Sequence, residues 1–267
     1  MKNILYWSIT VAVGGFLFGF DTAVISGADQ PLQKLWKTSD LFHGAMIMSS
    51  ALWGTVIGAL SGGLFCEYYG RKRVLTLVGL LYLISALGSA ISNDPIFFAI
   101  MRLLGGFGVG LSSIAVPAYI SEIAPAQYRG RLVALYQFQI VFGILVAFLS
   151  NYIISEFFML DWRWMLGIEA VPALIFMMMT MTIPESPRWL LLRRNDENEC
   201  RRILDIIDLS KTDETILSIK RTQNLVKDNL FVKQLTMPIL LAFLIAFFNQ
   251  LSGINFIIYF APRVFSL

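Results

Sequence analysis

Long apolar runs alternate with short polar connections along this chain. A transmembrane helix needs about 20 predominantly apolar residues, and the sequence offers seven runs of roughly this kind. Continuous runs favour helices, because the strands of a membrane β-barrel alternate apolar and polar positions in short segments. The runs cover residues 4–26, 43–65, 74–91, 95–120, 132–154, 162–183 and 237–260. The pattern therefore predicts an all-α protein that crosses the bilayer repeatedly.

The composition agrees with a membrane protein, and the positions of the basic residues predict its orientation in the membrane. Hydrophobic residues make up 57% and charged residues 15% of the 267 positions, and the net charge is only +3. Lys and Arg gather in the connections after the second, fourth and sixth runs, which all fall on one side of the membrane. Connections rich in Lys and Arg stay in the cytoplasm. We therefore expect a multi-pass protein of the cell membrane (inner or plasma membrane) with a cytoplasmic N-terminus and the lipid bilayer around it.

Three parts of the chain differ in composition. Residues 1–183 hold the first six runs and predict a six-helix transmembrane domain. Residues 184–235 form the one long hydrophilic stretch, in which isoleucines recur at helical spacing, so we expect a cytoplasmic helical linker domain. Residues 236–267 hold the seventh run, as if a second domain began there. We therefore expect the chain to be an incomplete fragment of a longer protein.

Two opposite charges lie inside the apolar runs at similar depths. Asp21 is about five residues from the outer end of its run and Arg102 about seven, so at 1.5 Å per residue their depths differ by about 3 Å. Ionisable groups inside the membrane are costly and indicate function by default. If protonation of Asp21 released Arg102, proton binding would be coupled to helix movement; the alternative is a permanent structural salt bridge. Glu169 is a third intramembrane carboxylate, either a proton relay or a structural group.

Neutral polar groups interrupt the fifth and seventh runs. In the seventh run they surround Gly253, and glycine-interrupted helices near the middle of the membrane are where transporters build binding sites. Amides both donate and accept hydrogen bonds, which suits a hydroxyl-rich ligand, and aromatic rings offer a face for stacking. The alternative is that the amides only hold helices together. The candidate ligand-binding residues are Phe18, Gln137, Asn249, Gln250, Asn255 and Tyr259.

Several short strings along the chain together resemble the sugar porter family of the major facilitator superfamily. The first is Gly-Phe-Asp-Thr-Ala-Val-Ile-Ser-Gly at 19–27, and the last is Gln-Leu-Ser-Gly-Ile-Asn at 250–255. Between them lie Gly-Arg-Lys-Arg at 70–73, Arg-Leu-Leu-Gly-Gly at 102–106, Glu-Ile-Ala-Pro at 122–125 leading to Arg-Gly at 129–130, and Pro-Glu-Ser-Pro-Arg-Trp-Leu at 184–190. Their order and spacing carry the resemblance over nearly the whole chain.

The resemblance implies a twelve-helix transporter of two six-helix domains, which alternates its access around a central sugar site. Asp21 resembles the proton-coupling carboxylate of bacterial sugar-proton symporters, where passive facilitators commonly have Asn, and Arg102 resembles its partner. Asn249 and Ile144 depart from the family pattern, because glutamines are common there. The amides Gln137, Gln250 and Asn255 match sugar-binding residues, and Phe18 matches a lining aromatic residue.

The resemblance also implies a cytoplasmic charge network that holds the outward-open state. Its residues match Glu67, Arg71, Arg73, Glu122, Arg129, Glu185 and Arg188. The expected partners are a monosaccharide, protons and the bilayer, with no nucleic acid, no cofactor, no metal and no required oligomer. Because most sugar contacts in the family come from the second domain, we expect this chain by itself to be unable to transport sugar.

Other function classes explain the sequence less well. An enzyme would need a nucleophile or metal site, but the single histidine, His43, has no Cys, His or paired carboxylates near it in the pattern. A proton-independent sugar facilitator remains an alternative, although Asp21 argues against it, and so does a sugar sensor built on a transporter fold. A channel is disfavoured by the motifs of alternating access.

Overall fold

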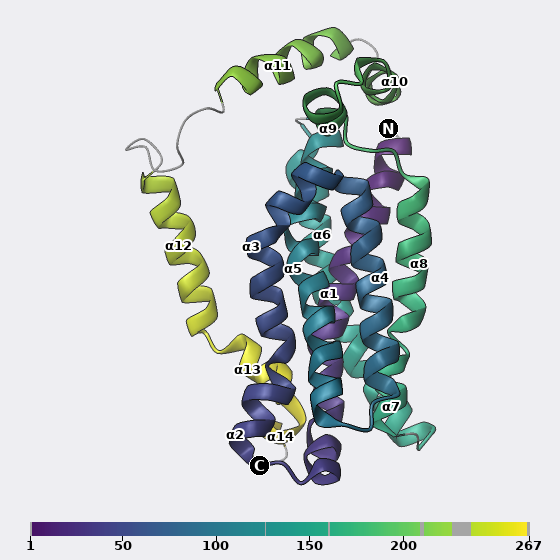
Figure 1. Cartoon of the computed structure of the whole chain (residues 1–267), viewed down its shortest axis with the longest axis vertical. Coiled ribbons are helices and arrows are strands. Elements are labelled where there is room, and N and C mark those ends of the chain that lie inside the picture. The colour runs from purple at the N-terminus through teal and green to yellow at the C-terminus, as the bar shows by residue number, and fades with distance from the viewer. Residues whose placement is uncertain (1, 126, 160, 209–210, 226–235, 266–267) are drawn as a thin grey trace.

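The first six predicted spans form one bundle of helices in the computed structural model, which describes residues 2–125, 127–159, 161–208, 211–225 and 236–265 (Figure 1). Six helical segments are long and apolar enough to cross a membrane, as the sequence predicts, and the described residues contain no strand. The elements are α1 (Lys2–Trp36), α2 (Asp40–Phe42), a π-helical segment η1 (His43–Met48), α3 (Ser50–Tyr69), α4 (Arg71–Ala90), α5 (Pro95–Ile123), α6 (Arg129–Tyr152), a second π-helical segment η2 (Ile153–Phe157), α7 (Trp162–Gly167) and α8 (Ala170–Thr182).

The hydrophilic linker is helical over the part that the structure describes. It contains α9 (Pro187–Trp189), a π-helical segment η3 (Leu190–Arg194), α10 (Glu197–Asp208) and α11 (Thr212–Leu225). These helices lie at the same end of the bundle as the N-terminus (Figure 1). Ile203 and Ile216 are buried in one cluster with Leu190, so the apolar faces of the linker helices pack on one another. Residues 226–235 of the predicted linker lie outside the described residues, and the three domain boundaries stay predictions.

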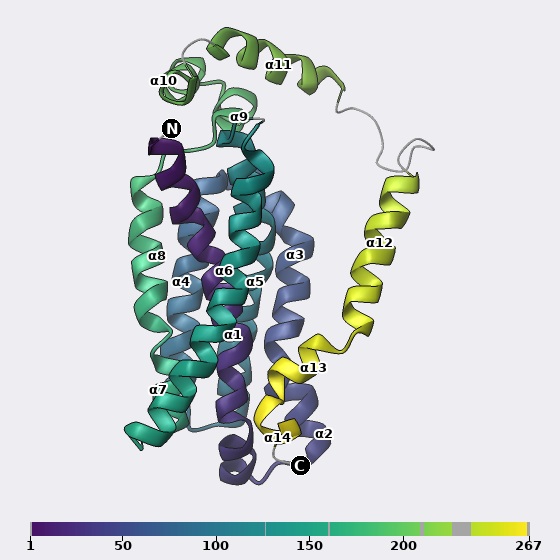
Figure 2. The ribbon, with the colours of Figure 1, turned by 180° about the vertical axis from the view of Figure 1, so that it is seen from behind.

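The seventh predicted span is not one continuous helix. It consists of α12 (Thr236–Leu251), α13 (Ile254–Tyr259) and α14 (Ala261–Phe265). The break is at Gly253, whose φ of 73° lies in the left-handed region that glycine adopts without a steric penalty. Helix α12 stands apart from the bundle in both views, whereas α13 and α14 return to α1 at the end of the bundle opposite the N-terminus (Figures 1 and 2). The glycine therefore redirects the chain rather than only weakening a straight helix.

Glycines let two pairs of helices approach backbone to backbone. A Cβ atom on Gly54 of α3 would overlap the carbonyl oxygen of Leu103 on α5, and one on Gly106 of α5 would overlap that of Ala51. Gly19 of α1 and Gly143 of α6 lie equally close to the facing helix. Small residues at such interfaces replace the hydrophobic driving force that lipid cannot supply between helices. The close packing positions α1 and α5, which carry the charges predicted to pair.

Two glycines on α3 offer a matched test of this packing. Gly54→Ala places a methyl group against the Leu103 backbone and should cost about 1–3 kcal/mol, seen as a lower melting temperature of the detergent-solubilised protein. Gly63→Ala is the same change on the same helix, but nothing lies within 4 Å of its Cβ position. It should leave the melting temperature unchanged or raise it slightly, because alanine has the higher helix propensity. Equal melting temperatures for the two variants would contradict the close contact.

Candidate functional site

The centre of the bundle holds a buried ion pair between α1 and α5. Asp21 and Arg102 are 1% and 2% exposed, and Nη1 of Arg102 contacts Oδ1 of Asp21. The second guanidinium nitrogen donates to the Asp21 backbone carbonyl at 3.1 Å and to Oδ2 at 3.3 Å. The structure thus contains the pair that equal depth in the sequence predicts. Both charges are withdrawn from water, and each depends on the other for compensation.

A second carboxylate belongs to the same buried cluster. Glu169 lies between α7 and α8, is 1% exposed, and interacts electrostatically with both Asp21 and Arg102. Its Oε1 atom has no hydrogen-bond partner among the described residues. Two buried carboxylates therefore lie in the field of one guanidinium group, but only Asp21 forms an ion pair with it. Such a site can bind a proton on one carboxylate, because the other carboxylate still compensates the charge of Arg102.

Helix α4 adds two polar side chains that sequence reasoning missed. The hydroxyl groups of Tyr82 and Ser85 are buried and lack a hydrogen-bond partner among the described residues. Tyr82 interacts electrostatically with Asp21 and Glu169, and Ser85 faces Gly105, one turn from Arg102. The signal in the sequence is their helical spacing within an apolar run. They give the cluster hydroxyl groups that can both donate and accept hydrogen bonds.

The amides of the seventh run meet at its break. Asn255 on α13 donates to Oε1 of Gln250 on α12 at 2.7 Å. Asn255 and Tyr259 line a cavity of about 230 Å³ against η1 and α3, where Met48 and Ser49 form part of the opposite wall. Tyr259 is buried and also interacts electrostatically with Arg102 and Asp21. One wall of the cavity therefore carries both Asn255 and a tyrosine that lies within electrostatic reach of the central charge cluster.

The remaining candidate ligand-binding residues are not brought to this cavity by any contact among the described residues. Gln137 is exposed on α6 and makes no hydrogen bond there. Phe18 is half-buried on α1 and packs on the hydrophobic core, and Asn249 is exposed on α12. Asn151, on the same face of α6 as Gln137, donates to the Val24 carbonyl at 3.0 Å and so holds α6 to α1. At least one amide of the fifth run thus fits the helix-packing alternative.

A polar cluster at the linker end of the bundle ties three elements together. Arg71, at the start of α4, pairs with Glu122 at the end of α5 at 2.8 Å. The other oxygen of Glu122 accepts a 2.5 Å hydrogen bond from Ser186. Glu185 accepts from the backbone N–H groups of Arg71, Lys72 and Ser186 at 2.8–3.0 Å. Burial raises the pKa of Glu185, and the three N–H donors oppose that rise.

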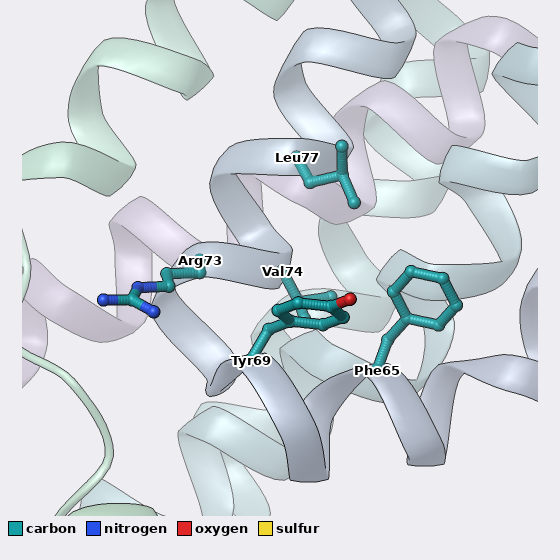
Figure 3. Close-up of a pocket in the computed structure, with 5 residues that line it drawn as sticks. All are labelled: Phe65, Tyr69, Arg73, Val74 and Leu77. Atoms are coloured by element: carbon teal, nitrogen blue, oxygen red, sulfur yellow. The ribbon is translucent and has the colours of Figure 1, made fainter.

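Other members of the predicted charge network lie elsewhere. Glu67 contacts Arg193 of the linker, a partner that the sequence reasoning did not include. Arg73, Arg129 and Arg188 form no ion pair within the described residues. Arg73 instead borders a cavity of about 250 Å³, where its guanidinium extends away from the rings of Tyr69 and Phe65 (Figure 3). The roles predicted for these three arginines stay predictions.

Comparison with known proteins identifies the family. Residues 7–267 match the family described as sugar (and other) transporter. The D-xylose transporter of Levilactobacillus brevis is 34% identical over 96% of this chain and 56% of its own length. The arabinose-proton symporter of Bacillus subtilis is 35% identical over 100% of this chain and 60% of its own length. This chain therefore spans a little over half of these relatives.

Solved structures agree with the sequence relatives. A partially occluded, inward-open structure of the xylose transporter XylE from E. coli superimposes with a TM-score of 0.86 at 33% identity, covering 98% of this chain and 67% of that one. The family and these structural neighbours are transporters, not enzymes. The superposition covers the six spans, the linker and the broken seventh helix, because it extends over 98% of this chain. This chain belongs to the sugar (and other) transporter family of the major facilitator superfamily.

Proposed function

We propose that this chain, together with the C-terminal part that its relatives possess, imports a monosaccharide (a hexose or a pentose) with protons by alternating access. The observation that carries the proposal is the buried cluster of Asp21, Arg102 and Glu169. Relatives described as arabinose-proton and D-xylose-proton symporters support it. A proton-independent facilitator is the second candidate, but it would have no need for two carboxylates around one buried arginine.

Asp21 is the proposed proton carrier. When Asp21 is ionised, Arg102 is held through both guanidinium nitrogens, and α1 and α5 are tied together. A proton on Asp21 removes its negative charge, so Arg102 is attracted to Glu169 instead. The exchange changes which helix Arg102 binds, from α1 to the α7–α8 connection. Proton binding would in this way bias the arrangement of the helices around the sugar.

The sugar is proposed to bind beside the break in the seventh helix. Asn255 and Gln250 offer amide groups, and Tyr259 joins the cavity to the proton cluster. Neutral hydrogen-bonding groups fit sugar hydroxyls, and a ring face fits the apolar side of a sugar. Gln137, Phe18 and Asn249 are proposed to join this site when α12 approaches the bundle.

The cluster of Arg71, Glu122 and Glu185 is proposed to act as the cytoplasmic gate. It joins the α3–α4 turn, the end of α5 and the start of the linker, so an opening of this side has to break it. The same end of the bundle carries the N-terminus and the basic connections (Figure 1). By the positive-inside rule this end is proposed to face the cytoplasm in the cell membrane.

The transport proposal is tested in a fusion in which this chain is continued by the C-terminal part of the arabinose-proton symporter. In liposomes with an imposed pH gradient, the fusion should accumulate sugar. Asp21→Asn should abolish gradient-driven accumulation but keep sugar exchange, because the amide cannot ionise. Glu156→Gln, an exposed carboxylate outside the cluster, serves as the matched control and should accumulate sugar normally. Uptake that is indifferent to the gradient would support the facilitator instead.

The sugar site is tested by titration of the same fusion with xylose, arabinose and glucose. Asn255→Ala removes an amide that the cavity presents and should weaken binding of the preferred sugar about tenfold, the size of one lost hydrogen bond to a polar ligand. Gln127→Ala changes an exposed amide in the connection between α5 and α6 and should bind as the parent does. If both variants bind equally well, the cavity is not the sugar site.

The cytoplasmic gate is tested through Glu185. Its raised pKa means that the folded protein binds more protons than the unfolded chain, so its contribution to stability falls as pH rises from its ordinary value through the folded pKa. Glu185→Gln keeps the Oε1 acceptor without the charge. Its melting temperature should equal the parent's near about pH 4 and exceed it near about pH 7. Glu185→Ala should melt lower than the parent at both pH values, because three N–H groups lose their acceptor; a glutamine variant as unstable as alanine would contradict this.

A further inference from the structure

We propose that Asp29 of α1 and Arg263 of α14 form an extracellular gate that closes the outer side of the sugar pathway. The gate ties the outer part of the broken seventh helix to α1, opposite the cytoplasmic cluster. The proposal rests on the proposed transport function and extends it, because it adds two gating residues that lie outside the sugar and proton sites.

The contact between the two residues is bidentate and centred on a buried carboxylate. Asp29 is 1% exposed. Arg263 donates through Nε to Oδ2 at 2.9 Å and through Nη2 to Oδ1 at 3.1 Å. The same guanidinium donates to Gln33, one turn further along α1, at 2.8 Å. Paired donors of this kind are the stronger form of arginine–carboxylate contact and fix the orientation of the partners.

His43 gives the Asp29 carboxylate a second donor. Its Nε2 lies 2.9 Å from Oδ1 of Asp29, and its Nδ1 lies 3.3 Å from the Thr38 hydroxyl. Because an ionised carboxylate only accepts hydrogen bonds, Nε2 is the donor. A buried carboxylate without any donor would be strongly destabilised. His43 therefore allows Arg263 to leave Asp29 without stranding the carboxylate.

The position of Arg263 makes its separation from Asp29 less costly than that of a buried pair. Its side chain is 39% exposed, whereas Arg102 in the central cluster is 2% exposed. Water can thus solvate the Arg263 guanidinium after separation, which lowers the cost of opening. Arg263 also borders a cavity of about 320 Å³ that is lined by Gln30, Gln33 and Lys34. The gate thus adjoins a polar recess at the outer end of the molecule.

The gate adjoins the proposed sugar cavity. Asp29 is bonded to His43, which precedes the cavity residue Gly44, and Arg263 follows the cavity residue Phe260 by three positions. Both α13 and α14 pack on α1 in this region (Figure 2). Separation of Arg263 from Asp29 would free α14 from α1 and open the cavity toward the outside. Closure of the outer side therefore depends on one ion pair between distant parts of the sequence.

The gate is tested by thiol accessibility in the intact chain. Met48→Cys places a reporter at a cavity position that is only 2% exposed, and a membrane-impermeant maleimide is added from outside to cells that express the protein. The two native cysteines, Cys66 and Cys200, are buried, and the chain without the reporter gives the background. Adding Arg263→Gln should raise the labelling rate about tenfold, the size of one lost charge-assisted contact. Asp29→Asn should raise it similarly, and Arg263→Lys should raise it less than Arg263→Gln, because lysine keeps the charge but not the paired donors.

The control is Arg163→Gln, which changes an arginine at the same end of the bundle whose partners are Asp161, Ser92 and Asn93. Its labelling rate should equal that of the reporter alone. An unchanged rate in Arg263→Gln, or an equal rise in Arg163→Gln, would overturn the gate. The labelling needs neither sugar nor a proton gradient. A failure there removes the gate alone, whereas a fusion that does not transport removes the proposed function.

Discussion

The charge pair of Asp21 and Arg102 is the interaction on which the rest of the site depends. Two opposite charges at the centre of an apolar bundle are tolerable only while they remain paired, because the desolvation of either one alone is far too costly. This requirement fixes the relative positions of α1 and α5. It also makes the pair sensitive to any group that can take the place of a partner, and Glu169 is such a group. The need to keep Arg102 paired therefore both holds α1 against α5 and makes their contact depend on the charge of Asp21 and Glu169.

Polar side chains along the bundle form three separate layers. The central layer contains Asp21 and Arg102, and the linker end contains Arg71 and Glu122. The layer at the opposite end contains Asp29 with Arg263 and His43. Between the layers the helices contact one another mainly through glycines and apolar side chains, with a few neutral hydrogen bonds such as that from Asn151 to the Val24 carbonyl. A transporter that opens alternately to its two sides needs contacts at each end that can break and form again. The ionic contacts at the two ends of this bundle are of that kind.

Much of this arrangement follows from the sequence because membrane spans are set by simple physical rules. Six spans and the pairing of Asp21 with Arg102 could be predicted from run length and depth alone. The break at Gly253 could be anticipated as a weak point, but the left-handed backbone that separates α12 from α13 could not. The spacing of Tyr82 and Ser85 places them on one face of their span, but the sequence does not show that this face meets Asp21, and so they were not predicted.

Contacts between distant segments were the least predictable. Arg263 lies 234 positions from Asp29, and no periodicity links them. Arg193 was missed as the partner of Glu67 because the linker contains many charges of both signs, and only the folded path of η3 selects one of them. The amides show the same limit. Identical chemistry serves to bind helices at Asn151 and to line a cavity at Asn255, and composition alone does not separate the two uses.

Helix α1 carries both Asp21 and Asp29 on one continuous stretch. Eight residues of helix correspond to about 12 Å, so the two carboxylates belong to a single stiff rod. If the Asp29–Arg263 contact is more stable at one tilt of α1, that tilt also becomes more favourable for the Asp21–Arg102 pair. The coupling free energy between the two sites is the same in both directions. If Asp21 carries the proton as proposed, its proton affinity therefore depends in part on the contact of Asp29 with Arg263. A substitution at Asp29 or Arg263 would then change the stability of the Asp21–Arg102 pair, although no residue between the two sites differs.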